Sequence, residues 1–152
     1  MTVLVDAFKQ AYPEHNIADL LYADTFHQPA IKIANQKSLV YNYLYLFTWD
    51  TPAVDNFAMS FYTPEIPFVM NNLDNAEPAT GNGIKAKKLA QTMSAAWTNF
   101  AKTSNPNGGD LSQWEAYIQV NSATMVFDNK EELKHKYDTK LLELLNPSYK
   151  LD

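Results

Sequence analysis

Hydrophobic residues recur at the spacing of a helix face in several separate segments of the chain. Residues 84–102 give the clearest pattern, and the lysines of this segment lie off its apolar stripe. A short amphipathic helix is predicted over residues 4–11, and Pro13 ends it because proline disfavours helix in the residue before it. A last helix is predicted over residues 137–145, where Asn146 and a following proline close it.

Weaker helical patterns lie between the first helix and residue 36. Asn16 can cap a helix that begins at Ile17 and bends or breaks before Phe26. Another helix is expected after Pro29. The residues of that helix expected to face inward are Ile31, Ile33 and Ala34.

Residues 39–49 are dense in aromatic and β-branched side chains and show little alternation with polar residues. This pattern is typical of a central strand that is buried on both faces. A shorter strand is predicted over residues 123–127. Residues 50–64 contain two prolines and little periodicity, and residues 71–83 have the composition of turns, so neither segment is predicted to form a helix or strand. The fold class is therefore mixed α and β, with helix predominating.

The amino-acid composition excludes several classes of partner and site for this protein. The 152 residues are 46% hydrophobic and 19% charged, which is ordinary for one soluble globular domain. A net charge of −5 disfavours nucleic acid and anionic membrane surfaces as partners, because both require a basic face. The chain has no cysteine, which excludes disulfides, thiolate nucleophiles and zinc–thiolate sites.

The first residues of the chain do not have the character of a targeting segment. Residues 1–6 include no basic stretch and no long apolar run, so no signal peptide is predicted. No segment approaches the roughly 20 apolar residues of a membrane span. A cytoplasmic location is the expectation that follows.

Short motifs in several of these segments occur in a fixed order along the chain. They are Phe26-x-x-Pro29-Ala30, Val40-Tyr41-x-Tyr43-x-x-x-Phe47, Glu65-Ile66-Pro67-Phe68-Val69, the run Trp97-x-x-Phe100-Ala101-Lys102-Thr103-Ser104-Asn105-Pro106-Asn107, Gln113-Trp114-x-x-Tyr117 and Met125-Val126-Phe127-Asp128. In this order they resemble the type-B carboxylesterases, the group that includes para-nitrobenzyl esterases and cholinesterases. The resemblance implies the C-terminal portion of an α/β-hydrolase fold, helix-rich with a small sheet, as one domain over residues 1–152.

The resemblance also implies chemistry that this sequence lacks. Family members hydrolyse carboxylic esters with a Ser–His–Glu triad whose serine lies in a Gly-x-Ser-x-Gly turn. No serine of this chain has a glycine two residues before it, and the only glycines are Gly81, Gly83, Gly108 and Gly109. The glycine-rich oxyanion loop and the segment that carries the triad acid are also missing from the sequence.

Only the histidine of the triad would fall within this chain, and the resemblance places it at Tyr62, three residues before Glu65. A phenol stays protonated at neutral pH, so it cannot relay a proton as imidazole does. Thr63 stands where the family usually has glycine, and Pro64 follows it. Tyr62 is interpreted either as a phenol that contacts a ligand or, in preference, as a ring that packs the loop.

Glu65 matches a family carboxylate near the catalytic centre. It could accept a hydrogen bond that supports the catalytic groups. The favoured interpretation is a structural carboxylate that holds the loop through backbone amides.

The remaining polar residues suggest no cofactor and no metal site. His15, His27 and His135 are interpreted as surface or capping histidines because no partner at metal-ligand spacing accompanies them. The basic group Lys85, Lys87 and Lys88 is interpreted as a solvated helix face.

Alternate rings occupy the predicted central strand. They are Tyr41, Tyr43, Tyr45, Phe47 and Trp49. They could line an aromatic or acyl pocket, but a sheet core covered by helices is the favoured interpretation.

Two hypotheses for function remain open at this point. In the first, the chain is the C-terminal part of a carboxylesterase and is inactive alone. In the second, it is a non-catalytic module that binds a hydrophobic ligand or a protein partner. The strand over residues 39–49 would present a free edge, so association with a serine-bearing hydrolase half or with a second copy of the chain is expected.

Overall fold

The computed structural model describes residues 2–14, 16–17, 20, 23–36, 43–49, 63–137 and 139–146. These residues form two compact units. The helical unit lies within Met1–Asn42, Tyr117–Ser122 and His135–Asp152, and the sheet unit comprises Tyr43–Ala116 and Ala123–Lys134. The prediction of a single domain over residues 1–152 stays a prediction.

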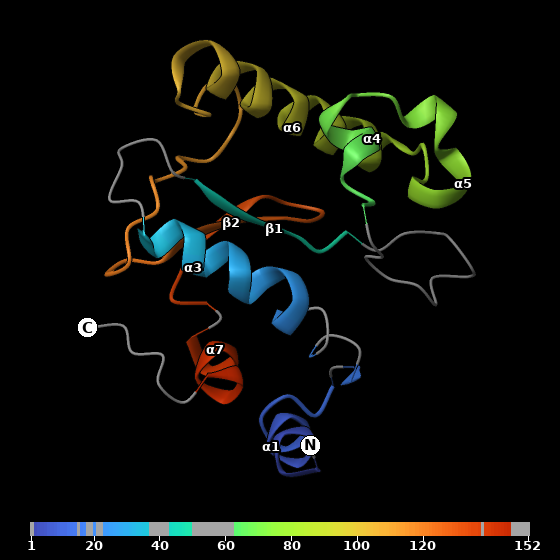
Figure 1. The fold of residues 1–152 in the computed structure, drawn as a ribbon. Helices are drawn as coiled ribbons and strands as arrows, with labels where there is room; N and C mark the ends of the chain where they lie inside the picture. The colour runs from blue at the N-terminus through green and yellow to red at the C-terminus, as the bar shows by residue number, and fades with distance from the viewer. Residues whose placement is uncertain are drawn as a thin grey trace. The chain divides into compact units, whose positions relative to one another are not determined.

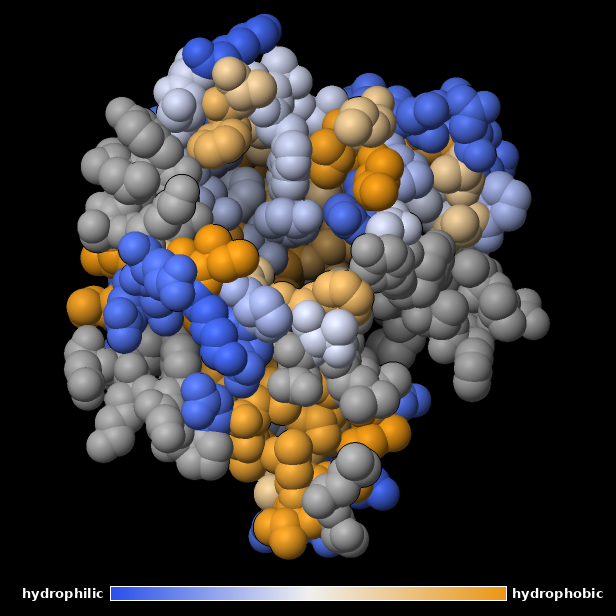
Figure 2. All heavy atoms as spheres, viewed as in Figure 1, coloured by the Kyte–Doolittle hydropathy of each residue, from blue (hydrophilic) through white to orange (hydrophobic). Residues whose placement is uncertain are grey.

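The helical unit contains helices α1 (Thr2–Ala11), α3 (Gln28–Gln36) and α7 (Thr139–Leu145), with a π-helical turn, η1 (Ala23–His27), before α3. Helix α1 packs against α7, and Lys140 Nζ lies 5.6 Å from the centre of the Tyr12 ring. Figure 2 shows hydrophobic residues at the surface of α1, where Val3 is 82% exposed. The sequence therefore predicted these three helices correctly, with small differences at their ends.

The inward face predicted for α3 is only partly correct. Ile31 and Ala34 are buried, but Ile33 is 63% exposed. Residues 31 and 34 lie one turn apart on the same helix face, whereas residue 33 is rotated well away from that face. The helix predicted after Asn16 lies largely outside the described residues.

The sheet unit is built on a three-stranded sheet of order β1-β2-β3, with β1 (Leu44–Phe47), β2 (Ala123–Phe127) and β3 (Glu132–His135). Strands β1 and β2 are parallel, with Leu44 opposite Thr124 and Phe47 opposite Phe127. The connection from β2 to β3 is short, which requires these two strands to be antiparallel. Strand β2 confirms the prediction for residues 123–127, and β1 confirms a strand within residues 39–49, of which 39–42 lie outside the described residues.

Strand β3 was not predicted from the sequence. Its residues, Glu-Leu-Lys-His, are mostly charged and lie at an edge of the sheet with exposed or half-buried side chains. A charged edge strand lacks the apolar alternation by which strands are recognised, and it discourages pairing with other chains.

Helix α6 (Ile84–Thr103) packs against the sheet, as Figure 1 shows, and α4 (Ile66–Val69) packs against α6. Buried residues of α6 such as Met93 and Ala96 form one core cluster with Met125 and Phe127 of β2. The helix confirms the prediction for residues 84–102. Its first residue, Ile84, is nevertheless 89% exposed, although the apolar pattern included it.

The segment between α4 and α6 contains more helix than its composition suggested. It forms a 3₁₀ turn, η2 (Leu73–Asn75), and a short helix, α5 (Glu77–Thr80). Both α4 and α5 have a proline in their first turn, at Pro67 and Pro78, where the missing N–H is not needed and the fixed φ favours helix. The prediction that residues 71–83 form only turns was therefore wrong, because proline starts helical turns as well as ending them.

Candidate functional site

The carboxyl end of β1 is the natural place for a site in this fold, since ligands of open α/β sheets bind beyond the carboxyl ends of the strands. The chain leaves β1 at Phe47, and the Thr48 N–H still donates to the Phe127 carbonyl of β2 at 2.9 Å. Residues 50–62 lie outside the described residues. The chain is described again from Thr63, directly before α4.

Three rings join the end of β1 to α4. Phe68 of α4 is fully buried, and its ring centre lies 5.1 Å from that of Phe47 and 5.6 Å from that of Trp49. Ring pairs at these separations stabilise a core beyond the area that they bury. Phe68 therefore fixes α4 against the strand end, independently of what the intervening loop does.

A buried hydrogen bond holds Trp49 from the other side. The indole Nε1 of Trp49 donates to the carbonyl oxygen of Thr80, at the end of α5, at 3.1 Å. The Thr80 hydroxyl donates in turn to the Ala76 carbonyl at 3.0 Å, and Thr80 is 1% exposed. Sequence reasoning missed Thr80, and no local pattern could have found it, because its partner is 31 residues away.

Glu65, a candidate site residue, lies directly before α4 and is half-buried. Its main-chain carbonyl accepts hydrogen bonds from Phe68 N at 3.0 Å and Val69 N at 2.9 Å. Its side chain makes no capping hydrogen bond to the helix. The backbone of Glu65, and not its carboxylate, thus starts α4. Tyr62, the other candidate, lies outside the described residues.

Thr63 has a left-handed backbone conformation, with φ of 66°. A β-branched residue rarely adopts this conformation, which glycine takes without strain. The Thr63 carbonyl accepts a hydrogen bond from Ile66 N at 3.4 Å, and Pro64 within the turn is buried. The turn therefore has a shape suited to glycine although threonine occupies it.

A second polar arrangement follows α6, where Ser104 ends the helix in a left-handed conformation. Asn107 acts as a clamp on the chain seven residues later: its Oδ1 accepts from Trp114 N at 2.6 Å, and its Nδ2 donates to the Trp114 carbonyl at 2.9 Å. Asn107 Nδ2 also donates to Asn105 Oδ1 at 2.7 Å. This single side chain replaces a strand partner for Trp114, whose ring belongs to the core cluster.

Comparison with known proteins assigns a family to this arrangement. Residues 6–145 match the profile described as "Carboxylesterase family". The chain is 31% identical over 137 residues to the para-nitrobenzyl esterase of Bacillus subtilis, covering 88% of this chain and 27% of that protein. It is 33% identical over 101 residues to human bile salt-activated lipase, covering 64% of this chain and 13% of the lipase.

The chain belongs to the carboxylesterase family.

Solved structures of carboxylesterases agree with the fold. An esterase from Clostridium hathewayi superposes with a TM-score of 0.72 at 30% identity, covering 97% of this chain and 30% of the esterase. A thermophilic para-nitrobenzyl esterase superposes with a TM-score of 0.71 at 27% identity, and the match covers 93% of this chain and 30% of that esterase. The helix-rich α/β-hydrolase fold with a small sheet is therefore confirmed, and the chain spans less than a third of these relatives.

Family membership gives the geometry around Thr63 a meaning. In carboxylesterases the resemblance places glycine at this position and histidine at the residue before it. The left-handed φ at Thr63 is a conformation that glycine adopts without strain, which agrees with the glycine that the resemblance implies at this position. The rings of Phe47, Trp49 and Phe68 pack together at the strand end that precedes this turn.

The rings of β1 contribute to the core of this carboxylesterase segment. Tyr45 packs edge-on against Trp97 at 4.9 Å, and Tyr43 packs edge-on against Trp114 at 5.7 Å. Tyr43, Tyr45 and Phe47 all pack against the core cluster that contains Trp49. The interpretation as a sheet core covered by helices is confirmed for these residues, and Tyr41 lies outside the described residues.

The histidines have different environments. His27 is buried, with 8% of its surface exposed, so it is not a surface histidine, and the alternative of a capping histidine stays a prediction. It ends the π-helical turn η1 and directly precedes α3, where η1 and α3 pack together. His135, at the end of β3, is exposed as predicted, and His15 lies outside the described residues.

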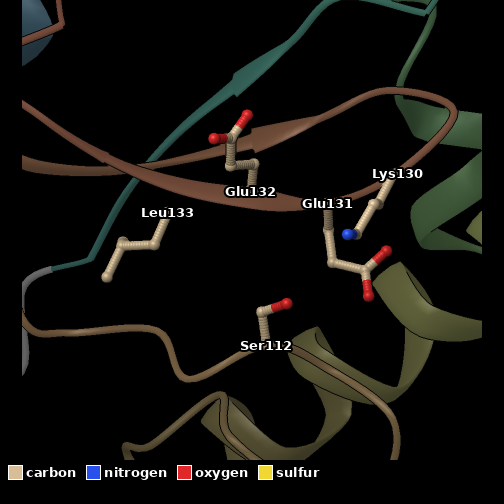
Figure 3. A pocket seen from close by; sticks show the side chains of 5 residues that line it. All are labelled: Ser112, Lys130, Glu131, Glu132 and Leu133. Atoms are coloured by element: carbon tan, nitrogen blue, oxygen red, sulfur yellow. The ribbon is translucent and has the colours of Figure 1, made fainter.

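A hollow of about 340 Å³ lies beside the β2–β3 connection of the sheet unit, lined by Ser112, Lys130, Glu131, Glu132 and Leu133. Figure 3 shows Lys130 and Glu131 extending toward the segment that carries Ser112, whereas Glu132 points away from it. None of the described residues that line the hollow is a histidine, and Ser112 does not lie in a Gly-x-Ser-x-Gly turn. This hollow does not have the composition of an acyl-transfer site.

The described part of the chain contains neither a cluster of metal ligands nor a membrane-spanning helix. Across these ranges, no group of three His, Asp or Glu side chains could hold a metal ion. None of their helices is long and apolar enough to cross a lipid bilayer.

Proposed function

We propose that this chain is the late-strand portion of a carboxylesterase-type α/β-hydrolase and that it does not hydrolyse esters by itself. The observation that carries the proposal is the absence of a Gly-x-Ser-x-Gly turn around any serine of the sequence. Ester hydrolysis through an acyl-enzyme needs a nucleophile, a base and oxyanion donors held together. The family's reaction would therefore require groups that this sequence does not supply.

The contacts at the carboxyl end of β1 support a structural role for these residues, in which they hold the neighbouring helices in place. Phe68 and Trp49 hold α4 and α5 around the strand end, and Glu65 sits at the start of α4. The resemblance places the family's catalytic histidine at Tyr62, in the segment between Trp49 and α4. We propose that this packing is retained while the proton relay is lost, and that Glu65 supports the loop.

The first experiment measures activity directly. Purified protein is incubated with a chromogenic short-chain ester and, separately, with a serine-directed fluorophosphonate, beside the para-nitrobenzyl esterase of Bacillus subtilis as the positive control. We expect neither turnover nor label on this chain. Covalent label on any of its serines would overturn the proposal.

A second experiment tests the role of position 62. The portion of the Bacillus subtilis esterase that precedes the matched segment is co-expressed with this chain or with its Tyr62→His variant. Tyr62→Phe serves as the matched control because it removes only the hydroxyl. We expect activity from Tyr62→His alone; activity of the unchanged chain in this assembly would show that Tyr62 does not block the triad.

Association is the partner proposal that follows from the sheet. Among the described strands, β1 has β2 on one side and none on the other. An uncovered edge exposes main-chain donors and acceptors beside apolar side chains, and such edges recruit further strands. We propose that β1 pairs with a strand of a serine-bearing hydrolase half or, without one, with a second copy of the chain.

Sedimentation tests this association. We expect the mass of the chain alone to rise with concentration and to shift to a defined heteromer when the upstream half is present. If the chain stays monomeric at high concentration and does not bind the upstream half, the proposal is contradicted.

The alternative function is a non-catalytic module that binds a hydrophobic ligand or protein. The exposed apolar surface of α1, with Val3 82% exposed, is the observation that favours it. Saturable binding of an apolar fluorescent ligand by a monomer, with loss of binding in Val3→Asp, would support this alternative. The cytoplasmic location stays a prediction.

A further inference from the structure

The chain contains two Asn-Gly pairs, Asn82-Gly83 and Asn107-Gly108. In such a pair the glycine nitrogen can attack the asparagine side-chain amide, because glycine offers no side chain that hinders the approach and leaves the backbone free to turn. The attack requires the asparagine side chain and the next peptide to rotate toward each other. Hydrogen bonds that fix either group therefore slow the reaction.

Asn107 is fixed at both groups. Its side chain bonds to the main-chain N and O of Trp114 and to Asn105 Oδ1, at 2.6 to 2.9 Å. Its own main-chain carbonyl, which belongs to the peptide bond to Gly108, accepts from Asn99 Nδ2 at 3.3 Å. A rotation that brought the Gly108 nitrogen to the side chain would break all of these bonds.

Asn82 is held far less. Its Nδ2 donates to Asp74 Oδ1 at 2.7 Å in an exposed contact. Its Oδ1 is buried and has no hydrogen-bond partner, which destabilises the present side-chain position. Gly81 precedes it with φ of 70°, and Gly83 follows it with open space around the Cβ position. The pair thus lies in a short segment with two glycines directly before α6.

We propose that Asn82-Gly83 is a site of spontaneous deamidation and that Asn107-Gly108 is protected by its tertiary structure. In the reaction, the Gly83 nitrogen forms a bond to Cγ of Asn82 while the Cγ–Nδ2 bond breaks, and ammonia leaves with the proton of the Gly83 amide. The resulting cyclic imide then takes up one water at either carbonyl. Hydrolysis gives aspartate or isoaspartate at position 82, and no oxidant or reductant is needed.

The product no longer fits its surroundings. A carboxylate at position 82 would face the Asp74 carboxylate at the distance now occupied by a hydrogen bond, 2.7 Å, so attraction becomes repulsion. One of its oxygens would also occupy the buried position of Oδ1, where charge is costly. The modification is therefore expected to release the link between η2 and the start of α6.

The experiment follows both sites in the same molecules. The intact chain is held in mildly alkaline buffer, and peptides are analysed over time by mass spectrometry with chromatographic separation of isoaspartate. We expect conversion at Asn82 to exceed that at Asn107 on the order of a hundredfold, since three more hydrogen bonds must break at Asn107 and each slows the reaction by about a factor of five. Equal rates, or a faster Asn107, would overturn the inference.

Two controls separate tertiary protection from sequence. In concentrated urea both pairs lose their contacts, so the two rates should converge; a difference that persists would place its cause in local sequence. Gly83→Ala should slow conversion at position 82 and leave position 107 unchanged, and the open space around Gly83 accommodates the added carbon. Asn82→Asp should reproduce the loss of stability of the aged protein, and an aged sample that remains as stable as fresh protein contradicts the proposed effect on α6.

Discussion

Two regions of the sheet unit adjoin the same ring-rich core, yet they differ in which family features they retain. After α6, Pro106 and Asn107 have the residue types that the carboxylesterase resemblance contains, and Asn107 makes the bonds that hold Trp114. After β1, the packing residue Phe68 is present, but Thr63 occupies a turn shaped for glycine. The first region needs only stable geometry, whereas catalysis in the second would need particular chemical groups.

The difference shows that packing and chemistry depend on separate constraints. A core accepts residues of suitable size and apolarity, so a family fold persists with about a third of its residues identical. A proton relay accepts very few side chains, because it must change charge near neutral pH. This difference is why we propose that the segment keeps the packing around the loop although the resemblance places a tyrosine at the histidine position.

The largest expected effect comes from removing Phe68, the ring that packs α4 against the end of β1. Phe68→Ala deletes a fully buried side chain in contact with Phe47 and Trp49, and we expect it to lower the free energy of unfolding by about 3–5 kcal/mol. Urea denaturation of the full chain measures this change. Met70→Ala, at a position 70% exposed, is the control and should change stability by less than about 0.5 kcal/mol. Similar losses in both variants would show that Phe68 does not anchor α4.

The next largest effect tests the clamp after α6. Asn107→Ala removes three side-chain hydrogen bonds and leaves the Trp114 amide and carbonyl without this partner, so we expect a loss of about 2–3 kcal/mol. Asn129→Ala is the matched control, because Asn129 bonds only to its neighbour Asp128 in an exposed contact. If Asn107→Ala is as mild as the control, water replaces the clamp and the turn is not a stabilising element.

Trp49 and Trp114 allow a direct test of how much the hydrogen bond of Trp49 contributes at the end of β1. Trp49 donates its N–H to Thr80, whereas the buried N–H of Trp114 has no hydrogen-bond partner. Trp49→Phe and Trp114→Phe remove the same volume, but only the first leaves a carbonyl unpaired, so it should cost about 1–2 kcal/mol more. Thermal and urea unfolding of the two variants give this difference. A larger loss of stability in Trp114→Phe than in Trp49→Phe would show that the Trp49–Thr80 bond does not stabilise the end of β1.

The smallest expected effect concerns Thr63, where we expect a substitution to raise the free energy of unfolding. Thr63→Gly relieves the left-handed strain of a β-branched residue but gives the unfolded chain more freedom, so we expect a net gain of about 0.5 kcal/mol. Thr98→Gly, at an exposed position of α6, should instead lower stability by a similar amount, about 0.5 kcal/mol, because glycine disfavours helix. Opposite signs for the two variants would confirm the strained turn, and two losses would contradict it.

The sequence by itself determined the helices with strong periodicity, the strand over residues 123–127 and the family. Periodic apolar positions report which face of an element is buried, and ordered motifs report common ancestry of a fold; both are properties of the chain before it folds. The missing serine turn could be read in the same way, because a tight turn of this kind requires glycines at fixed positions.

Only the tertiary structure decided which residues hold the strand end and the turn after α6. The Trp49–Thr80 bond spans 31 residues, His27 is buried, and the charged strand β3 pairs with β2. The two Asn-Gly pairs are identical as dipeptides and differ only in their contacts. Such features depend on long-range packing, which local sequence patterns do not encode.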